Sequence, residues 1–584
     1  MLADGSLDPR EATHNGIVQG GYGRSNLDRI ANTSFNAELP LNNGLILYGY
    51  GTYSYRNIKD ARGGFRPTNV ASLPQIYPNG FQAYRRIWEN DFQLSGGARG
   101  VLGGWNWDAT TSYGRDDVKL GAENTLNPSL GPTSKTNFFI GKQIADLWVS
   151  NLDFDKGFDL GLANPLQVAT GIEYRWEKFQ NQAGEPDSYR NGGYIIPKDS
   201  TPFGLLNGGK LPPAGLVSFT GTTPDDAISL SRTNIAAYVD AGTDITDKWF
   251  AGVALRAEHY DDSAGDTVSC KISTRYVLGN GFAIRGGVNS GFRAPSLAQQ
   301  GFSTTQNTGT INAQGSLETF QSKFLPISAP QAILLGAKPL KPEKSRNYTL
   351  GLTYEPISRL RVTIDGYQID IDDRIVKTEQ LRGTAVQAIL ASQGFNDLAA
   401  AQYFTNAIDT TTIGVDIVGE YTQSLGAGAL KWTLAYGSNR SRIRHVIDNP
   451  AELSSLGPTL VLFGRQAQRD LLVSSPRDKL IAGADWTKGP YRMNLKAIRY
   501  GKYIESGPVE SADQRFPATW TADFEASVNL NERVSLSVGA NNLFNTYPKK
   551  RAASVLFDGS GLYGSFSPYG LIGGFYYARA AVRY

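Results

Sequence analysis

The chain has 584 residues, and no Pro-rich, Ser-rich or like-charge run divides it, so one continuous architecture is expected rather than several linked domains. Its net charge of +3 argues against a nucleic-acid-binding protein, and one cysteine and three histidines leave no internal disulfide and no zinc pattern. A mean hydropathy of −0.31, with no apolar run near the ~18 residues of a membrane helix, excludes a helical membrane protein.

Alternation of apolar and polar residues with a period of two is the dominant pattern along the chain, and it predicts β-strands. In one segment, for example, Val253, Leu255 and Ala257 alternate with Arg256 and Glu258. About nineteen such strands are expected, to be compared with the ~9–11 residues that a tilted strand needs to cross a bilayer. They are expected to begin near residues 29, 44, 90, 105, 139, 165, 232, 249, 266, 281, 345, 360, 411, 429, 476, 491, 519, 534 and 571.

The connections between these strands alternate in length. Short ones include LNNG at 41–44 and TKGP at 487–490, whereas long ones include 181–231, 296–343 and 445–475. Tight periplasmic turns and large outer loops are typical of outer-membrane barrels. A soluble β-sandwich would alternate too, but the apolar positions here carry many Tyr, Trp and Ala and few bulky core-packing clusters. The pattern predicts an all-β fold, a transmembrane antiparallel β-barrel with long extracellular loops and short periplasmic turns.

The last strand, within 571–584, alternates up to a terminal aromatic residue, Tyr584, which resembles the assembly signal of bacterial outer-membrane proteins. If this strand ends in the periplasm, counting back makes the strand near residue 29 run inward from outside. We therefore expect residues 1–28 to be a truncated N-terminal loop segment and residues 29–584 to be the barrel. Because plugged transporters have 22 strands, about 19 of an expected 22 would be present.

The polar positions of the alternating strands are expected to face the lumen, where water or a plug tolerates charge. This set comprises Arg256, Glu258, Arg285, Arg293, Asp365 and Asp523. Generic solvation of a polar lumen is the alternative interpretation for each of them.

Ligand contacts are expected from the long outer loops, because aromatic rings stack on sugars or aromatic chelators and cations attract anionic chelates. The candidates are Tyr194, Phe203, Phe302, Phe324, Tyr563, Phe566 and Tyr569, with Arg293 at the rim and Arg190, Lys198, Arg465 and Arg469 as cations. Packing of the loops on themselves is the alternative. The loop 376–405 contains LRGTAVQAILASQ and NDLAAAQYF, whose Ala-rich spacing predicts one or two short helices.

Nothing in the sequence indicates catalysis. His14, His259 and His445 have no nucleophile at a motif spacing, and neither GxSxG nor HExxH occurs. DIDD at 370–373 could suggest calcium, but it lacks the glycine and distal glutamate of an EF-hand, so a solvated strand end is favoured. We expect no enzyme activity, no catalytic residue, no metal site and no cofactor.

Several segments, taken in order, resemble one family, the TonB-dependent outer-membrane receptors. SGFRAPSL at 290–297 looks like the family's GFRAP-type segment, and LKPEKSRNYTLGLTYEP at 340–356 with LRVTIDGYQIDIDDRI at 360–375 looks like the hairpin that follows. TTTIGVDIVGEY at 410–421 and VSLSVGANNLFNTYP at 534–548 resemble the next strand and the penultimate strand, and RTNIAAYVDAGTDITDKWFAGVALRAEHYDD at 232–262 also fits. The resemblance spans roughly residues 230–584, and its specificity lies in the order and spacing of these segments.

The resemblance implies an outer-membrane importer that binds a scarce ligand outside the cell, such as a ferric siderophore, with cobalamin or an oligosaccharide as alternatives. It implies lumen residues that hold a plug or line the ligand path. Residues 1–28 do not resemble a plug or a TonB box, so TonB is expected as a partner only if those parts are encoded upstream. A passive porin-like channel or a non-functional barrel fragment is the alternative function. Outer-membrane lipid is an expected partner, and nucleic acid is not.

Overall fold

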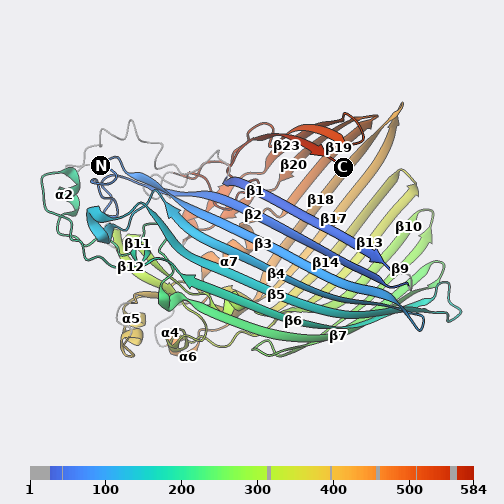
Figure 1. Cartoon of the computed structure of the whole chain (residues 1–584), viewed down its shortest axis with the longest axis horizontal. Helices are drawn as coiled ribbons and strands as arrows, with labels where there is room; N and C mark the ends of the chain where they lie inside the picture. Colours follow the sequence, from blue (N-terminus) through green and yellow to red (C-terminus); the bar gives the residue numbers. More distant parts are fainter. Residues whose placement is uncertain are drawn as a thin grey trace.

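The structure is a computed structural model, and it describes residues 26–583 except 42–43, 312–316, 395–397, 455–460, 508 and 553–561. Most of the chain forms one antiparallel sheet of nineteen strands, in which every strand except the first and the last pairs with the sheet strands before and after it (Figure 1). The strands are β1 (Leu27–Pro40), β2 (Ile46–Phe65), β3 (Phe81–Leu102), β4 (Trp105–Glu123), β5 (Asn137–Phe158), β6 (Leu166–Ala183), β7 (Ile228–Thr246), β8 (Trp249–Tyr260), β9 (Asp266–Gly279), β10 (Phe282–Arg293), β13 (Glu343–Ile357), β14 (Leu360–Lys377), β17 (Phe404–Leu425), β18 (Gly428–Val446), β19 (Asp478–Lys488), β20 (Tyr491–Tyr500), β23 (Thr519–Asn529), β24 (Val534–Asn541) and β25 (Phe575–Val582). The expected number of strands and the antiparallel order are confirmed.

Most strands begin within four residues of their expected positions, and two begin earlier. β3 begins at Phe81 rather than near 90, and β17 begins at Phe404 rather than near 411. In both strands the extra residues reach past the alternating part into the layer of loops, where Phe81 and Ala407 are buried. Loops cover these extensions, so their sequence does not follow the simple alternation of a strand in lipid.

The outward face of the sheet is apolar and exposed, as the alternation predicts. Val253, Leu255 and Leu350 expose 54%, 48% and 62% of their surface. A continuous exposed apolar face of this kind is the lipid-facing belt of a transmembrane barrel. Trp249 and Trp432 lie near the short-turn ends of β8 and β18, where an aromatic girdle is expected. None of the helices in the described part of the chain is long and apolar enough to cross a membrane.

Short turns gather at one end of the sheet and long connections at the other (Figure 1). The β8–β9 link, residues 261–265, is the exception, because it is short but lies at the long-loop end. The long connections carry smaller elements: α2 (Pro202–Asn207), α3 (Leu297–Gly301), β11 (Thr304–Ile311), β12 (Leu317–Phe324), α4 (Pro330–Leu334), β15 (Leu381–Arg382), α5 (Thr384–Ala391), β16 (Ala400–Gln402), α6 (Ala451–Ser454), α7 (Arg465–Val473), β21 (Tyr503–Glu505) and β22 (Gln514–Phe516).

The loop layer has its own apolar cores, which the alternation did not predict. One core joins the β2–β3 loop to the β4–β5 and β6–β7 loops around Leu73, Leu126 and Leu216. A second core packs α4 and α5 with Tyr403, which is fully buried and donates a hydrogen bond to the Leu335 carbonyl oxygen (2.7 Å). In the described residues, these cores hold the connections that they join as an ordered layer rather than as free loops.

One predicted helix of the 376–405 loop is confirmed as α5. The second helix that the prediction allowed for, at NDLAAAQYF, is absent from the described part of that segment, because Ala400–Gln402 forms strand β16. β16 pairs with β12 and β15 in a small four-stranded sheet, which buries Ala400 and Ala401 completely. Tertiary pairing overrides the helical propensity of the alanines here.

Within the described residues, the two outermost strands of the sheet pair on one side only. β1 pairs with β2, and β25 pairs with β24, with no ladder between β1 and β25. The three further strands expected for a barrel of 22 therefore stay a prediction. The loop expected over residues 1–28 falls almost wholly outside the described residues, as does the terminal Tyr584.

Candidate functional site

The inner, polar face of the sheet is tied together by side chains that reach across a glycine on the strand between them. Arg285 on β10 donates to both carboxylate oxygens of Asp365 on β14, at 2.6 and 2.7 Å. The residue between them in register is Gly351 on β13. A Cβ at Gly351 would lie 2.2 Å from Asp365 Oδ1, so only glycine leaves room for this bridge.

The same arrangement recurs with tyrosine as the long side chain. The Tyr238 hydroxyl on β7 donates to Asp153 Oδ1 on β5 (2.7 Å) above Gly171 on β6. At the C-terminal end of the sheet, Tyr577 on β25 reaches Glu525 on β23 (2.8 Å) above Gly539. These bridges lie in the half of the lumen nearer the short turns. Each one joins three strands, which stiffens the wall that a plug or ligand would meet.

Arg256 and Glu258, both expected in the lumen, form an ion pair at 2.6 Å on β8. Arg256 also lies 3.3 Å from Glu173 on β6, which in turn holds Arg175 at 2.8 Å. The side chain of Glu258 is only 8% exposed. The expected residues therefore belong to a network of paired charges on the inner wall rather than to isolated solvated groups.

Asp523 lines a polar hollow of about 310 Å³ on the inner face of β20, β23, β24 and β25. Its carboxylate accepts a hydrogen bond from the backbone N–H of Asn542 (2.8 Å). The other charged residues of the hollow are Arg492, Lys496 and Glu525, none of which the sequence alone singled out.

Arg293, expected at the rim, makes two hydrogen bonds to Glu343 (2.6 and 2.9 Å) but leaves 55% of its side chain exposed.

The loop aromatics expected to touch a ligand mostly pack against other loop residues. Phe203 is 7% exposed within the first loop core, and Tyr194 packs against the same core. The Phe302 ring lies 5.9 Å from Phe324, Tyr563 stacks on Tyr547 at 5.6 Å, and Tyr569 lies 5.5 Å from Tyr500. Phe566 is the well-exposed member of the set, at 41%. The arrangement fits the alternative of loop self-packing for the buried members.

Three of the four predicted loop cations are also paired, whereas Lys198 is exposed and forms no ion pair with the described residues. Arg190 holds Asp187 at 2.6 Å, and on α7 Arg465 and Arg469 lie 2.9 and 3.4 Å from Asp513 of the β20–β23 loop. The hydrogen bond from Arg465 holds the pKa of the Asp513 carboxyl below its usual range. These two ion pairs with Asp513, which we call the Asp513 clasp, connect α7 to the β21–β22 hairpin.

Acidification should loosen this clasp. Because the pKa of Asp513 is lowered in the folded state, its contribution to stability is present above the ordinary aspartate pKa and is lost as the pH falls through the lowered value. We expect the hydrogen-exchange protection factors of the β21–β22 hairpin to fall in acid. Burial raises the pKa of Asp470 on α7, so that group takes up its proton first. Asp513→Asn should therefore be loose at every pH, and an unchanged acid response in this variant would assign the effect elsewhere.

Sequence reasoning missed the most buried cation of the outer rim, Arg232 on β7. Its guanidinium lies 2.6 Å from Glu177 and 3.2 Å from Asp262, and it donates to the Pro295 carbonyl oxygen at 2.6 Å. Pro295 closes the GFRAP segment, which overlaps the end of β10, so Arg232 joins that segment to β6 and the β8–β9 link. Little in the sequence indicates that Arg232 is buried and paired, because it lies in an ordinary run of alternating polar and apolar residues.

Nineteen antiparallel strands with an apolar outer face, a charged inner face and an ordered layer of loops at one end define a transmembrane β-barrel with a polar lumen. The family model described as TonB dependent receptor-like, beta-barrel matches residues 15–543. The chain belongs to the TonB-dependent receptor family.

Among curated proteins, the chain is 23% identical over 316 residues to a probable TonB-dependent siderophore receptor, PirA, of Acinetobacter baumannii. It is 27% identical over 192 residues to an iron-regulated outer membrane virulence protein of Vibrio cholerae. These matches cover 53% and 32% of this chain, but only 38% and 25% of the relatives. The matched part is thus less than half of either relative.

Solved structures of the same class share the fold. A mutant of the ferric enterobactin receptor PfeA from Pseudomonas aeruginosa matches with a TM-score of 0.59 and 16% identity, covering 94% of this chain and 69% of that one. The siderophore receptor PirA from Acinetobacter baumannii matches with a TM-score of 0.55 and 14% identity, covering 96% and 79%. At these identities the likeness shows the fold alone.

Proposed function

We propose that this chain is the barrel portion of an outer-membrane receptor for TonB-dependent uptake of a ferric siderophore, without catalytic activity of its own. The observation that carries the proposal is the family match over residues 15–543. The ligand class is supported by the relatives, whose names include a siderophore receptor and an iron-regulated protein, and by a solved neighbour in complex with enterobactin. An iron chelate is therefore preferred over cobalamin or an oligosaccharide.

The geometry is suited to this role in two ways. The bridged inner wall presents fixed charges to a plug or a passing ligand, and the packed loop layer positions the few exposed groups. Of the expected ligand contacts, Phe566 and Arg293 combine exposure with a place at the loop end. We propose these two as contacts, with Asp523 and its polar hollow along the path through the lumen. TonB is proposed as the energy-coupling partner because it is general to the family.

The test is growth and uptake in the source bacterium. Deleting the gene that encodes this chain should abolish growth on one or more ferric siderophores under iron limitation, and uptake of radiolabelled iron with that siderophore should cease. Returning the intact gene should restore both, except in a strain that lacks TonB. Unchanged uptake of every iron chelate, with impaired growth on cobalamin or an oligosaccharide instead, would reassign the ligand.

A passive porin-like channel is the second candidate, and the charged, polar inner face of the sheet is the observation that fits it. A barrel with an open lumen would give a steady ionic conductance when the purified protein is inserted into a planar bilayer. A receptor closed by a plug should give almost none. Large, constant conductance from the intact gene product would support the channel and count against regulated uptake.

A further inference from the structure

Seven charged residues gather on the outward face of the barrel, at the long-loop ends of β13, β14 and β18. We call them the outer basic patch: Lys344, Arg346, Asp370, Asp372, Arg440, Arg442 and Arg444. One row of the sheet register runs from Arg346 through Asp370 and Thr411 to Arg442. The row just below it holds Tyr348 and Ile413, which are 42% and 50% exposed members of the lipid-facing belt. The patch therefore stands on the lipid side of the wall at the upper edge of the belt, where Arg440 shares the row of Ile413 and the other members lie above it.

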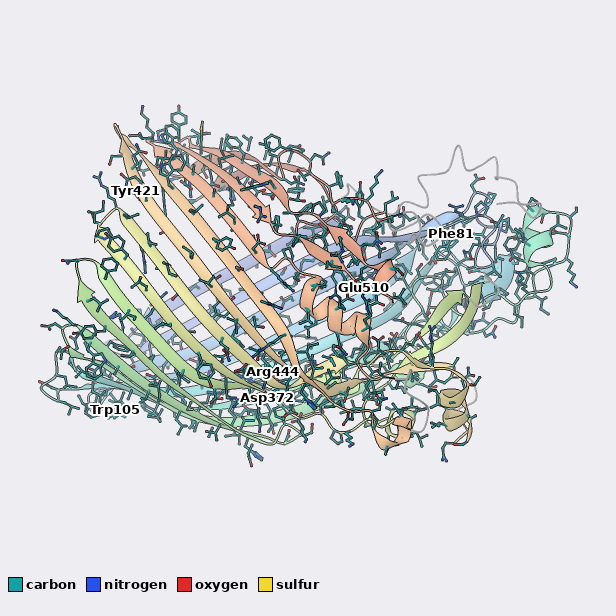
Figure 2. The ribbon with its side chains drawn as sticks, turned by 180° about the vertical axis from the view of Figure 1, so that it is seen from behind. Phe81, Trp105, Asp372, Tyr421, Arg444 and Glu510 are labelled. Carbon is teal, nitrogen blue, oxygen red and sulfur yellow. The ribbon has the colours of Figure 1, made fainter. Side chains whose placement is uncertain are left out.

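Two arginines of the patch converge on one carboxylate. Arg346 lies 2.8 Å from Asp372, and Arg444 binds the other oxygen of the same group. Figure 2 shows Arg444 and Asp372 together at the loop end of the strands, whereas Tyr421 marks the opposite end. Asp370 accepts hydrogen bonds from Thr411 and from Gln368, at 2.5 and 2.9 Å. Asp372 thus holds both arginine side chains, and Asp370 lies 4.0 Å from Arg444.

The remaining cations of the patch have no protein counter-charge. Lys344, Arg440 and Arg442 form no ion pair with any residue that the structure describes, and all three are exposed. Five cations face two carboxylates, which leaves an excess of three positive charges on a surface that adjoins hydrocarbon. Cations at such a boundary attract the phosphate groups of lipids.

The height of the patch matches the boundary of the hydrocarbon layer. Arg346 stands eleven residues from Ile357, where β13 ends at the short turn. A strand that rises about 3.4 Å per residue and tilts by about 40° gains roughly 25–30 Å over that length. The apolar band of an outer-membrane barrel is about 25 Å tall, so the patch lies at headgroup level.

Directly below the patch, the outward face is hollowed by a groove of about 500 Å³. Its floor is formed by Gly286 and Gly366, which flank Leu350 in register. Its upper end is Tyr348 and Gln368, the row next to Arg346 and Asp370. The other apolar side chains of the lining are Ile272 and Val288. The groove and the patch are continuous along the strands.

We propose that this outward face is a binding site for one phosphorylated membrane lipid, whose anionic headgroup lies on the outer basic patch and whose acyl chain fills the groove. The charge excess, the headgroup height and the adjoining groove each point to the same occupant. Arg440 and Arg442 supply charge that no protein group balances, and the paired arginines Arg346 and Arg444 fix its geometry. The site depends on the barrel fold and not on the ligand proposed for the lumen.

The test is lipid retention by the purified protein. The chain is refolded in bilayers of phosphatidylcholine with a small share of phosphatidylglycerol, extracted in non-ionic detergent, and examined by native mass spectrometry. The wild-type chain should retain phosphatidylglycerol in preference to phosphatidylcholine. Arg440→Gln with Arg442→Gln should weaken retention on the order of tenfold or more, since each cation near a membrane surface contributes about fivefold. Inorganic phosphate should not displace the lipid, because it cannot occupy the groove.

Two further variants keep the result interpretable. Lys271→Gln with Lys502→Gln removes two cations that have no ion pair among the described residues and lie outside the patch, and it should leave retention unchanged. Gly366→Leu fills the groove where a Cβ meets nothing closer than 3.9 Å, so it should fold and still lose the lipid. Equal retention by wild type and the patch variant, or equal losses in the patch and control variants, would overturn the site. Displacement by inorganic phosphate would reduce it to an anion site without an acyl chain.

Discussion

Replacing Arg232 by methionine should lower the free energy of unfolding by about 3–5 kcal/mol, the cost of breaking a buried ion pair by removing one partner. The side chain of Arg232 is 7% exposed, and its loss leaves Glu177 and Asp262 facing each other without a counter-charge. It also leaves the Pro295 carbonyl oxygen without its donor. The measurement is urea unfolding of the refolded barrel, followed by tryptophan fluorescence and by the gel shift of the folded form.

A matched control separates this effect from the general loss of an arginine. Arg275 is 53% exposed and forms one ion pair among the described residues, with Asp244 at 3.0 Å. Arg275→Met should therefore change the free energy of unfolding by no more than about 1 kcal/mol, as exposed ion pairs do. Adding Glu177→Gln to Arg232→Met should recover part of the loss, because it removes one of the stranded charges. If Arg232→Met and Arg275→Met lower the free energy of unfolding equally, the ion pairs of Arg232 contribute no more than an exposed surface pair does.

The wall of the barrel could be predicted from the sequence because lipid imposes a strict rule on it. Residues such as Val253 and Leu255 must be apolar, while Arg256 and Glu258 on the alternate face of the same strand need not be, and this contrast survives in a single sequence. The rule stops at the membrane boundary. The extension of β3 at Phe81 and the strand at Ala400–Gln402 are determined by loop contacts, and nothing local marks them.

The sequence predicts which residues face the lumen, but not which of them pair with one another. Arg285 and Asp365 were both expected to point inward, yet their pairing depends on the register of β10, β13 and β14 across 80 positions of sequence. The loop candidates show the opposite limit. Phe203 has the composition of a ligand contact in a polar loop, but its burial depends on packing against loops far away in sequence. Aromatic content alone does not distinguish the two roles.

The second large effect concerns the glycines that lie beneath the side-chain bridges of the inner wall. The change that a Gly→Val substitution makes in the free energy of unfolding should differ in sign between such a glycine and one on the outward face. Gly171→Val should lower the free energy of unfolding by about 3 kcal/mol or more, through overpacking and an unmade hydrogen bond. Its Cβ would lie 2.3 Å from Asp153 Oδ1 and 2.7 Å from the Tyr238 ring, so the bridge cannot form.

The matched control for this substitution is Gly419→Val on the outward face of β17, where a Cβ meets nothing closer than 4.0 Å. There the same change should be neutral or stabilising by up to about 1 kcal/mol, because valine favours strands and glycine does not. Tyr238→Phe keeps the ring and loses only the hydroxyl, so it should cost about 1–2 kcal/mol and leave the strands in register. The measurement is urea unfolding of the three variants, and it compares their unfolding midpoints with that of the wild type. If Gly171→Val and Gly419→Val shift the midpoint in the same direction and by the same amount, the glycines act through backbone freedom alone, and the bridges do not hold the wall together.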